Sequence, residues 1–464
     1  MLKLFNKYFP IRNFLFFIGE SVLIIAGIWL AMYLLSGGEG SEAPSRGPVF
    51  LKILLTTLLI QASLYYHNLY EFSQFYTFAD LSIRIVQAIG FACIFLAVFY
   101  FFLPATALHQ TIFFVGLFFL LLVLVSWRIG YQYICRNKLF NEKIVLVGDG
   151  SLASLISKEI NENLDSGYSV AAVFSNPGKT GLARQIGVEE YNSYDRICDV
   201  ALAKGASKIV VSLEERRGRY PTQSLLDCRM QGMRVLEGIS FYEMLSGKIL
   251  ATQTPPSWLI FSEGFHRHHL VLLSKRGLDI LFACFGLIVS LPLIAVLALL
   301  IKATSPGPVF FRQSRTGKQE RPFQVVKFRT MREDAETSSG AVWASEKDPR
   351  VTAVGGVLRK FRLDEIPQFW NVLKGEMSFV GPRPERPEFV EQLKKQLPYY
   401  GERHTVNPGI TGWAQVNYGY GASEEDALRK LEYDLYYIKH LSLLFDLYIV
   451  LKTVKAVLIG EGVR

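Results

Sequence analysis

The first 140 residues contain four long apolar stretches, and this feature restricts the possible folds more than any other part of the sequence. The stretches cover residues 14–35, 49–66, 81–103 and 111–134. Each is close to the roughly 20 residues that a helix needs to cross a bilayer. Hydrophobic residues make up 50% of the chain and the mean hydropathy is positive, which is too apolar for an ordinary soluble protein. Residues 1–140 are therefore predicted to form an N-terminal four-helix transmembrane bundle.

Basic residues around these stretches predict their orientation. Those that flank the predicted bundle are Lys3, Lys7 and Arg12 before it and Arg136, Lys138 and Lys143 after it. The loops 36–48 and 104–110 together hold a single basic residue, Arg46. Because cytoplasmic loops are enriched in Lys and Arg, both ends of the bundle are expected in the cytoplasm. Glu20 lies inside the first stretch, where we expect it to face the bundle interior in a structural role.

Residues 141–250 have the pattern of a Rossmann-like α/β cytosolic domain. The sequence "KIVLVGDGSLASLI" predicts a buried strand, a glycine-containing turn and a helix, and "YSVAAVFSN" and "SKIVVSL" predict further strands. The second strand ends in Phe174, Ser175 and Asn176, so no acid stands there to bind a ribose hydroxyl. The domain also has no YxxxK pair. A regulatory or structural domain without a redox cofactor is predicted, followed by a linker over residues 251–274.

The five cysteines do not show a metal-binding or disulfide pattern. They are Cys93, Cys135, Cys198, Cys228 and Cys284, and none forms a CxxC pair. Isolated buried thiols are the expected interpretation.

A fifth apolar stretch, residues 278–301, is predicted to enter the membrane without crossing it. Lys275 and Arg276 precede it, Lys302 and several more basic residues follow it, and both flanks therefore favour the cytoplasm. Pro292 near its middle removes one backbone hydrogen bond and kinks a helix. We expect a re-entrant helix broken at Pro292, and the alternative is a fifth spanning helix.

The residues after this stretch combine many cations with an adjacent pair of carboxylates. A Pro/Gly-rich loop is expected to carry Arg312 and Arg315, and a strand to carry Lys327 and Arg329. One helix is expected to carry Arg359, Arg362, Asp364 and Glu365, and a rigid turn to carry Arg383. Such cation density suits a pyrophosphate, with one carboxylate as nucleophile and the other near Mg²⁺. Adjacent helical positions diverge by about 100°, so both carboxylates share one cleft only at a helix end or bend, which Pro367 favours.

Several ordered motifs in this region give the sequence a specific resemblance. They are "KRGLDILFACFGLIVSLPLI", "SPGPVFFRQSRTG", "KFRTM", "RLDEIPQFWNVLKGEMSFVGPRP" and "PGITGWAQV". Residues 275–464 thereby resemble the catalytic domain of the bacterial sugar transferase family, the monotopic polyprenyl-phosphate phosphoglycosyl transferases. The two preceding parts resemble the large branch of that family, and the first residues its exopolysaccharide subgroup. The family often has Ser directly before the helix-breaking proline, whereas Leu291 precedes Pro292 here and Ser290 lies one residue earlier.

The resemblance implies roles for individual residues. Asp364 matches the nucleophile that forms a covalent phosphosugar intermediate, and Glu365 matches the partner associated with Mg²⁺. The positions implied to contact substrate are Arg359, Pro382, Arg383, Pro384, Lys327, Arg315 and Arg329. The implied C-terminal fold is an α/β catalytic domain with a re-entrant membrane helix.

The resemblance also implies the substrates and the location. A UDP-sugar would donate a sugar 1-phosphate to undecaprenyl phosphate at the cytoplasmic face of the bacterial inner membrane, which starts exopolysaccharide, O-antigen or capsule synthesis. No nucleic acid is expected as a partner. The sugar and the oligomeric state, a homodimer included, stay open. Two other hypotheses are a nucleotide-sugar oxidoreductase or dehydratase that uses the Rossmann-like domain, and a non-catalytic scaffold for polysaccharide assembly.

Overall fold

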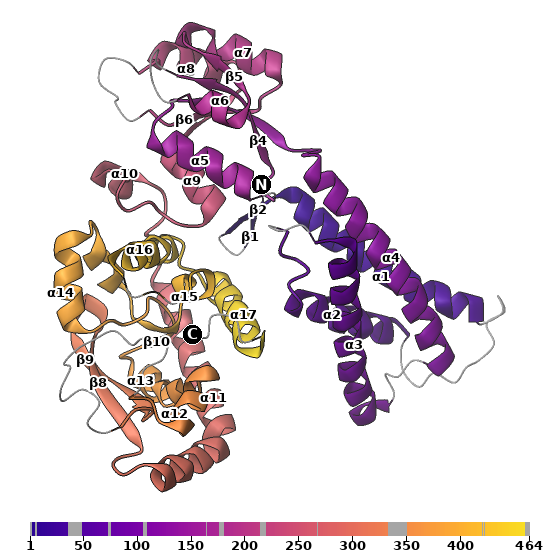
Figure 1. The fold of residues 1–464 in the computed structure, drawn as a ribbon, viewed down its shortest axis with the longest axis vertical. Helices are drawn as coiled ribbons and strands as arrows, with labels where there is room; N and C mark the ends of the chain where they lie inside the picture. The colour runs from indigo at the N-terminus through magenta and orange to yellow at the C-terminus, as the bar shows by residue number, and fades with distance from the viewer. Residues whose placement is uncertain are drawn as a thin grey trace. The chain divides into compact units, whose positions relative to one another are not determined.

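The structure is a computed structural model in which the chain divides into two compact units (Figure 1). Unit 1 comprises Met1–Leu2 with Tyr8–Phe241, and unit 2 comprises Lys3–Lys7 with Tyr242–Arg464. The structure describes residues 2–4, 7–35, 49–72, 76–104, 109–163, 165–175, 181–213, 220–266, 268–332, 350–419, 421 and 423–459. Strands β1 (Leu2–Leu4) and β2 (Lys7–Phe9) form a short two-stranded sheet at the start of the chain.

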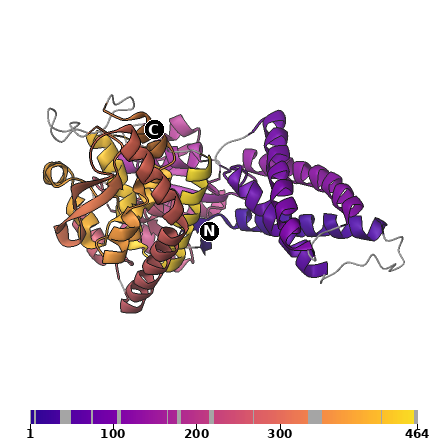
Figure 2. The same cartoon turned by 90° about the horizontal axis from the view of Figure 1, so that it is seen from below.

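Unit 1 begins with four long apolar helices that match the predicted stretches. They are α1 (Ile11–Leu35), α2 (Val49–Tyr66), α3 (Phe78–Phe102) and α4 (Gln110–Arg136). Helix α1 packs along α4 and α2 along α3, and Figure 2 shows the four as one group. Their shared core contains Ile24, Leu64, Ile85 and Leu124, while many other apolar side chains face outward. Most of the loops 36–48 and 104–110, including Arg46, lies outside the described residues.

Glu20 faces the interior of this helix group, as predicted. Its side chain is fully buried, and Arg128 Nη2 of α4 lies 2.7 Å from Glu20 Oε1. The Tyr70 hydroxyl donates to the same carboxylate, and Arg128 also donates to the carbonyl of Leu69. Since a buried charge is costly without a partner, the ion pair joins α1, α4 and the turn after α2 in one arrangement.

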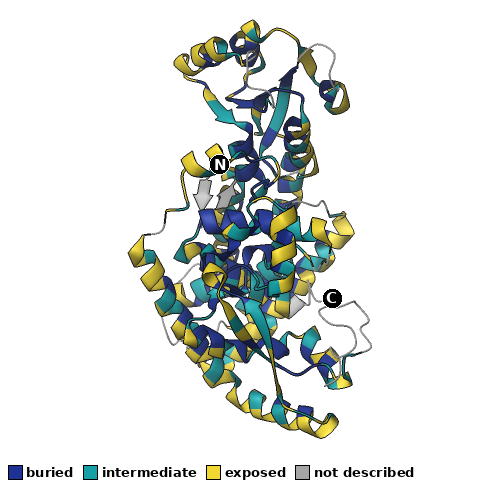
Figure 3. Ribbon diagram, turned by 90° about the vertical axis from the view of Figure 1, so that its left-hand side faces the viewer, coloured by how far each residue is buried: buried dark blue, intermediate teal, exposed yellow. Residues whose placement is uncertain are grey.

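The rest of unit 1 is a parallel α/β domain. Its sheet has the order β5-β4-β3-β6-β7, with all neighbours parallel. The strands are β3 (Glu142–Val147), β4 (Tyr168–Phe174), β5 (Glu189–Tyr191), β6 (Lys208–Val211) and β7 (Arg234–Glu237). The helices are α5 (Ser151–Glu162), α6 (Leu182–Ile186), α7 (Ile197–Lys204), α8 (Thr222–Met230) and α9 (Gly238–Ser246), which begins in unit 1 and continues into unit 2. Figure 3 shows buried strands between helices with exposed outer faces.

The turn after β3 depends on glycine. Gly148 has a φ of +118°, and a Cβ there would lie 2.9 Å from the carbonyl carbon and oxygen of Ser212. Central strands β3 and β6 can therefore approach closely only with glycine at this position. Asn176, the end of the predicted second strand, lies outside the described residues, and β4 ends at Phe174.

The expectation of isolated thiols is wrong for two of the five cysteines. Cys198 on α7 and Cys228 on α8 form a disulfide, with their Cα atoms 5.3 Å apart. Both helices pack into the same hydrophobic core, and this brings together residues that are 30 positions apart in sequence. Local spacing contains no signal for such a pair. Cys93, Cys135 and Cys284 are free thiols.

Unit 2 starts before the predicted boundary, and the segment predicted as a linker packs within it. The backbone amide of Ile249 donates to the carbonyl of Glu432, and the Tyr399 hydroxyl donates to the carbonyl of Thr254. Helix α10 (Pro256–Phe261) follows, with Trp258 buried. Residues 251–266 are therefore part of a packed unit, since they bury polar and aromatic groups against residues far along the chain.

The fifth apolar stretch is a single long helix, α11 (His269–Thr304), which continues through Pro292. The helical assignment is not interrupted at Pro292, while the ribbon of α11 changes direction along its length (Figure 1). The Ser290 hydroxyl donates to the carbonyl of Gly286, a contact that often bends helices. Most of the outer side of α11 is apolar and exposed (Figure 3). Among the described residues, five helices, α1 to α4 and α11, are long and apolar enough to cross a membrane.

The main elements of the rest of unit 2 follow α11 along the chain. They are β8 (Phe310–Thr316), β9 (Pro322–Phe328), α12 (Ala353–Lys360), the 3₁₀ turn η4 (Leu363–Glu365), α13 (Gln368–Lys374), β10 (Ser378–Val380), α14 (Pro387–Gln396), the 3₁₀ segment η5 (Tyr400–Thr405), β11 (Gly409–Thr411), α15 (Trp413–Asn417), α16 (Glu424–Lys439) and α17 (Leu443–Ile459). Strands β8 and β9 form an antiparallel hairpin, and β10 pairs with β11 in parallel.

Candidate active site

The hairpin β8–β9 presents one face to the acidic pair. The segment predicted as a Pro/Gly-rich loop with Arg312 and Arg315 is strand β8, because it pairs with β9 from Phe310↔Phe328 to Thr316↔Pro322. Side chains alternate between the two faces of a strand, and directly opposed residues share a face. Gln313, Arg315 and Lys327 consequently lie on one face, and Arg312 lies on the other.

A backbone break places Asp364 and Glu365. The single helix expected here ends at Lys360, and Arg362 adopts the left-handed region with a φ of +53°. The turn η4 carries both carboxylates, and Pro367 then precedes α13. Asp364 is 9% exposed and Glu365 is 8% exposed. The predicted bend is therefore present, and it allows two adjacent residues to line the same site.

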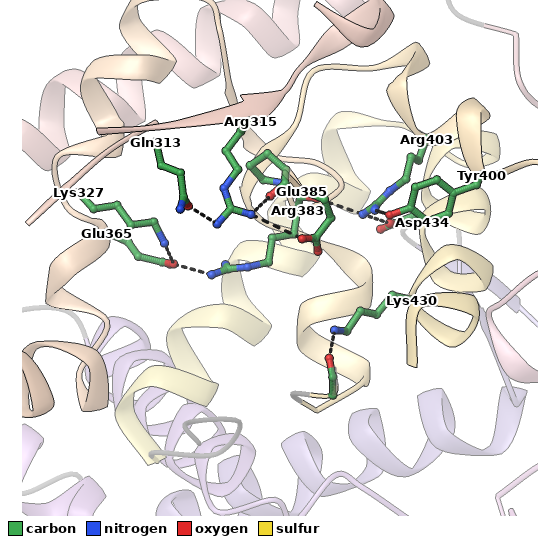
Figure 4. Close-up of polar contacts among 12 residues, drawn as sticks. Gln313, Arg315, Lys327, Glu365, Arg383, Glu385, Tyr400, Arg403, Lys430 and Asp434 are labelled. Carbon is green, nitrogen blue, oxygen red and sulfur yellow. Dashed lines mark hydrogen bonds and ion pairs between the residues drawn. The ribbon is translucent and has the colours of Figure 1, made fainter. Parts of the chain in front are cut away.

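Two cations hold Glu365. Lys327 Nζ lies 3.0 Å and Arg383 Nη2 lies 2.8 Å from the same oxygen, Glu365 Oε1 (Figure 4). Burial alone would raise the pKa of Glu365, but the charges of Arg383 and Lys327 outweigh it and hold the pKa well below its usual range. Glu365 is therefore a fixed anion that brings residues of β9 and of the loop after β10 together.

Asp364 has a different environment. In the described part of the chain its carboxylate makes no hydrogen bond and no ion pair. Burial raises the pKa of Asp364, and the neighbouring charge of Glu365 adds to this effect. Lys327, Arg359 and Arg383 act in the opposite direction through their charges. Asp364 is thus a buried carboxyl group near cations, and its oxygens remain available for chemistry.

The other basic residues that were predicted to bind substrate donate hydrogen bonds to different parts of unit 2. Arg359 Nε donates to Thr330 Oγ1 at 2.9 Å, and Arg359 still contributes its charge to Asp364. Arg329 donates to the carbonyls of Ser305 and Pro306, so it fixes the chain after α11. Arg315 donates to Gln313 Oε1 and to the carbonyl of Pro384. Neither Arg315 nor Arg329 makes a direct contact with the two carboxylates.

Pro382, Arg383 and Pro384 form a loop between β10 and α14. At its base a Cβ on Gly381 would lie 2.4 Å from the carbonyl oxygen of Asn407, so only glycine fits there. The loop directs the side chain of Arg383 to Glu365 (Figure 4). Two buried residues behind it, Arg403 and Asp434, were not predicted from the sequence, since residues 31 apart carry no common motif.

A large cavity of unit 2 lies on the other face of the hairpin. Its volume is about 860 Å³, and residues from α11, from the opposite face of the hairpin and from α13 line it, among them Ile294, Arg312 and Trp370. Asp364 and Glu365 do not line this cavity. The candidate active site is therefore identified by the chemistry of the buried carboxylates and their cations, and this cavity is a separate feature of unit 2.

The acidic pair is compatible with Mg²⁺ only together with a phosphorylated ligand. Across the described ranges no group of three or more His, Cys, Asp or Glu side chains could hold a metal ion. Mg²⁺ commonly uses one or two carboxylates, with waters and substrate phosphates as its other ligands. Glu365 Oε1 is occupied by two cations, and Oε2 has no hydrogen bond or ion pair in the described part of the chain. Glu365 and Asp364 therefore fit a Mg²⁺ site in which substrate phosphates and waters supply the other ligands.

Comparisons with known proteins match the part of the chain that contains these residues. The family model "Bacterial sugar transferase" matches residues 270–460. The chain is 52% identical over 190 residues to the UDP-N-acetylgalactosamine-undecaprenyl-phosphate N-acetylgalactosaminephosphotransferase of Aeromonas hydrophila, covering 41% of this chain and 45% of the relative. It is 35% identical over 350 residues to the UDP-glucose:undecaprenyl-phosphate glucose-1-phosphate transferase of Escherichia coli (strain K12), covering 70% of each.

A shorter relative delimits the matching part. The "Exopolysaccharide production protein PSS" of Rhizobium leguminosarum bv. phaseoli is 40% identical over 200 residues, which are 41% of this chain and 98% of that protein. The alignment with the Escherichia coli protein extends over two thirds of both chains, and the family model contains the acidic pair and the loop that carries Arg383. The chain therefore belongs to the bacterial sugar transferase family, the polyprenyl-phosphate phosphoglycosyl transferases.

Proposed function

We propose that this protein transfers a sugar 1-phosphate from a UDP-sugar to undecaprenyl phosphate through a covalent intermediate on Asp364. The observation that carries the proposal is the contrast within the acidic pair. Lys327 and Arg383 clamp Glu365, while Asp364 is buried beside the same cations without a hydrogen bond or ion pair in the described part of the chain. A nucleophile needs free oxygens, and a phosphoanhydride needs nearby cations.

The reaction divides into two displacements at one phosphorus atom. In the first, an oxygen of Asp364 attacks the phosphorus that carries the sugar, the bond to the bridging oxygen breaks and UMP leaves. In the second, an oxygen of undecaprenyl phosphate attacks the same phosphorus and the bond to Asp364 breaks. The products are undecaprenyl diphosphate sugar and a regenerated carboxylate. Arg383, Lys327 and Arg359 stabilise the negative charge that develops on the phosphoryl oxygens.

Mg²⁺ belongs to the proposal as a bound cofactor. Glu365, with Asp364 beside it, would hold the ion, and the ion would offset the charge of the pyrophosphate. Glu365 also fixes Lys327 and Arg383, so its carboxylate orders the cations of the site whether or not a metal is bound.

The proposed location is the bacterial inner membrane, with unit 2 at its cytoplasmic face. Helices α1 to α4 would cross the bilayer, since basic residues gather at the two ends of this segment. For α11 we propose re-entry, and two contacts support it. Lys275 before Pro292 pairs with Asp446, and Ile301 after Pro292 packs with Phe328, so both parts of the helix are anchored in unit 2. A lipid phosphate and a soluble nucleotide can meet at such a surface.

Asp364→Asn tests the mechanism most directly. The purified full-length protein would be incubated with undecaprenyl phosphate and a panel of UDP-sugars, and the lipid product would be identified by mass spectrometry. We expect the wild type to transfer one or a few sugars, and Asp364→Asn to release no UMP. A donor incubated without acceptor should leave a phosphosugar adduct on the peptide containing "RLDEIP". Transfer by Asp364→Asn would exclude Asp364 as the nucleophile.

The relatives named above act on different sugars by their printed names, N-acetylgalactosamine and glucose. The panel therefore includes UDP-glucose, UDP-galactose and both UDP-N-acetylhexosamines, and identifying the product defines the sugar. The resulting lipid-linked sugar would begin an exopolysaccharide, O-antigen or capsule glycan.

A further inference from the structure

The backbone of the loop that carries Arg383 is anchored through its carbonyl groups, while the side chains of Arg383 and Glu385 form ion pairs with Glu365 and Arg315. Pro382 and Pro384 have no amide hydrogen and cannot donate backbone hydrogen bonds. The carbonyls of residues 382–385 instead each accept one hydrogen bond from another element. The donors are Gly409 N to Pro382 at 2.9 Å, Arg403 Nη2 to Arg383 at 3.0 Å, Arg315 Nη1 to Pro384 at 3.2 Å and Thr316 N to Glu385 at 2.9 Å.

Arg403 is the most deeply buried side chain among these donors. It lies in η5, is 5% exposed, and its Nη2 contacts Asp434 Oδ2 at 2.8 Å. Its Nη1 donates to the Tyr400 hydroxyl at 2.5 Å. Asp434 on α16 is 1% exposed, so both charges depend on one another for their burial. The planar guanidinium reaches three acceptors in fixed directions, which an ammonium group on a flexible stem cannot reproduce.

Arg403 is connected to the acidic pair through Arg383. Arg403 binds the main-chain carbonyl of Arg383, and the side chain of Arg383 binds Glu365 at 2.8 Å (Figure 4). The Arg403 guanidinium is too buried to meet a substrate itself. Its influence on the reaction must therefore pass through the position of Arg383.

We propose that Arg403, fixed by Asp434, is a positioning residue that keeps the guanidinium of Arg383 on Glu365 during phosphosugar transfer. The inference rests on the proposed function for the roles of Asp364, Glu365 and Arg383. Displacement of a catalytic cation by about 1 Å costs on the order of 10²-fold in rate, so a residue behind the site can affect catalysis strongly.

A double-mutant cycle tests this inference with the full-length protein. The variants are Arg403→Lys, Arg383→Lys and the double variant, and the readout is kcat/KM for UMP release with undecaprenyl phosphate as acceptor. If Arg403 acts through Arg383, Arg403→Lys lowers kcat/KM on the order of 10²-fold in the wild type. In the Arg383→Lys background it lowers kcat/KM by less than about 3-fold, because the position of the arginine side chain no longer matters.

Glu243→Gln provides the matched control. Glu243 is a buried carboxylate of unit 2 that pairs with Lys439 Nζ at 2.7 Å and with His440 Nε2 at 2.7 Å. Its replacement weakens a buried ion pair without touching the loop. We expect its effect on kcat/KM to be the same factor in the wild-type and Arg383→Lys backgrounds, as for a loss of folded protein.

Equal losses from Arg403→Lys in both backgrounds would overturn the inference. If Arg403→Lys does not fold, Asp434→Asn replaces it in the cycle, because asparagine still accepts a hydrogen bond but no longer fixes the guanidinium by charge. In the cycle with Asp434→Asn, equal losses in both backgrounds would likewise overturn the inference. Failure of the proposed function would appear separately, as UMP release retained by Asp364→Asn.

Discussion

Asp364 and Glu365 are neighbours in sequence, yet their pKa values move in opposite directions. Burial raises the pKa of Asp364, with Glu365 adding to it, whereas Arg383 and Lys327 lower that of Glu365 despite its burial. A nucleophilic carboxylate must be ionised. As the pH falls through the raised pKa, the carboxylate of Asp364 is protonated and is no longer a nucleophile. We predict that adduct formation declines on acidification at a pH above the ordinary aspartate pKa of about 3.9, measured by single-turnover UMP release.

Glu365→Gln is the informative variant for this profile. It removes the like charge beside Asp364 and releases Lys327 and Arg383 from their partner, so the pKa of Asp364 should fall. The residual activity should then persist to lower pH than in the wild type, although its maximum is reduced. An acid limb that stays in place in Glu365→Gln would show that another group controls it.

The sequence identified the acidic pair but not its support. Adjacent carboxylates near Pro367 and the cations Lys327 and Arg383 are visible as local motifs, and the structure brings these four residues together. Arg403 and Asp434 were missed because their meeting depends on how η5 packs against α16. Arg315 and Arg329 each donate to backbone carbonyls in the structure, and their predicted contact with substrate stays a prediction.

At the scale of elements, the ion pair between α1 and α4 should determine the stability of the helix group. Glu20→Gln leaves Arg128 buried without its counter-charge, which costs about 3–5 kcal/mol when one partner of a buried pair is removed. We predict a clearly lower melting temperature in detergent. The double variant Glu20→Gln/Arg128→Met should recover part of the loss, because no buried charge remains. A double variant less stable than the single one would contradict this explanation.

Helix α11 tests the topology that basic flanks predict. Lys318, exposed just after β8, is replaced by cysteine in a protein whose native cysteines have been removed. If α11 is re-entrant, a membrane-impermeant thiol reagent labels this cysteine in inverted vesicles and not in intact spheroplasts. Labelling in intact spheroplasts would instead make α11 a fifth spanning helix. The sequence predicts the entry from charge and a kink from the hydrogen bond that Pro292 removes, and the ribbon of α11 changes direction without an interruption of the helix (Figure 1).

At the scale of the whole molecule, the division between units was the hardest feature to predict. Composition changes strongly near residue 140, and β3, the first strand of the α/β domain, begins at Glu142. Near residue 250, Pro255 and Pro256 suggest a linker, whereas unit 2 already includes Tyr242. What binds this segment to the rest of unit 2 are contacts with residues far along the chain: the Tyr399 hydroxyl donates to the carbonyl of Thr254, and the amide of Phe265 donates to the carbonyl of Lys439. Local patterns contain no information about such pairs.

Two fragments distinguish the structural boundary from the one that composition suggests. A fragment of residues 242–464 keeps the pairs of Glu243 and the hydrogen bond from Trp413 Nε1 to the carbonyl of Gly247 at 2.8 Å, whereas a fragment of residues 268–464 lacks them. Both fragments contain residues 270–460, which the family model matches, and we expect the longer fragment, which keeps these contacts, to transfer phosphosugar in membranes. The shorter one should melt at lower temperature and be less active, because Lys439 and Trp413 lose buried partners. Equal melting temperatures would mean that the segment merely lies against unit 2.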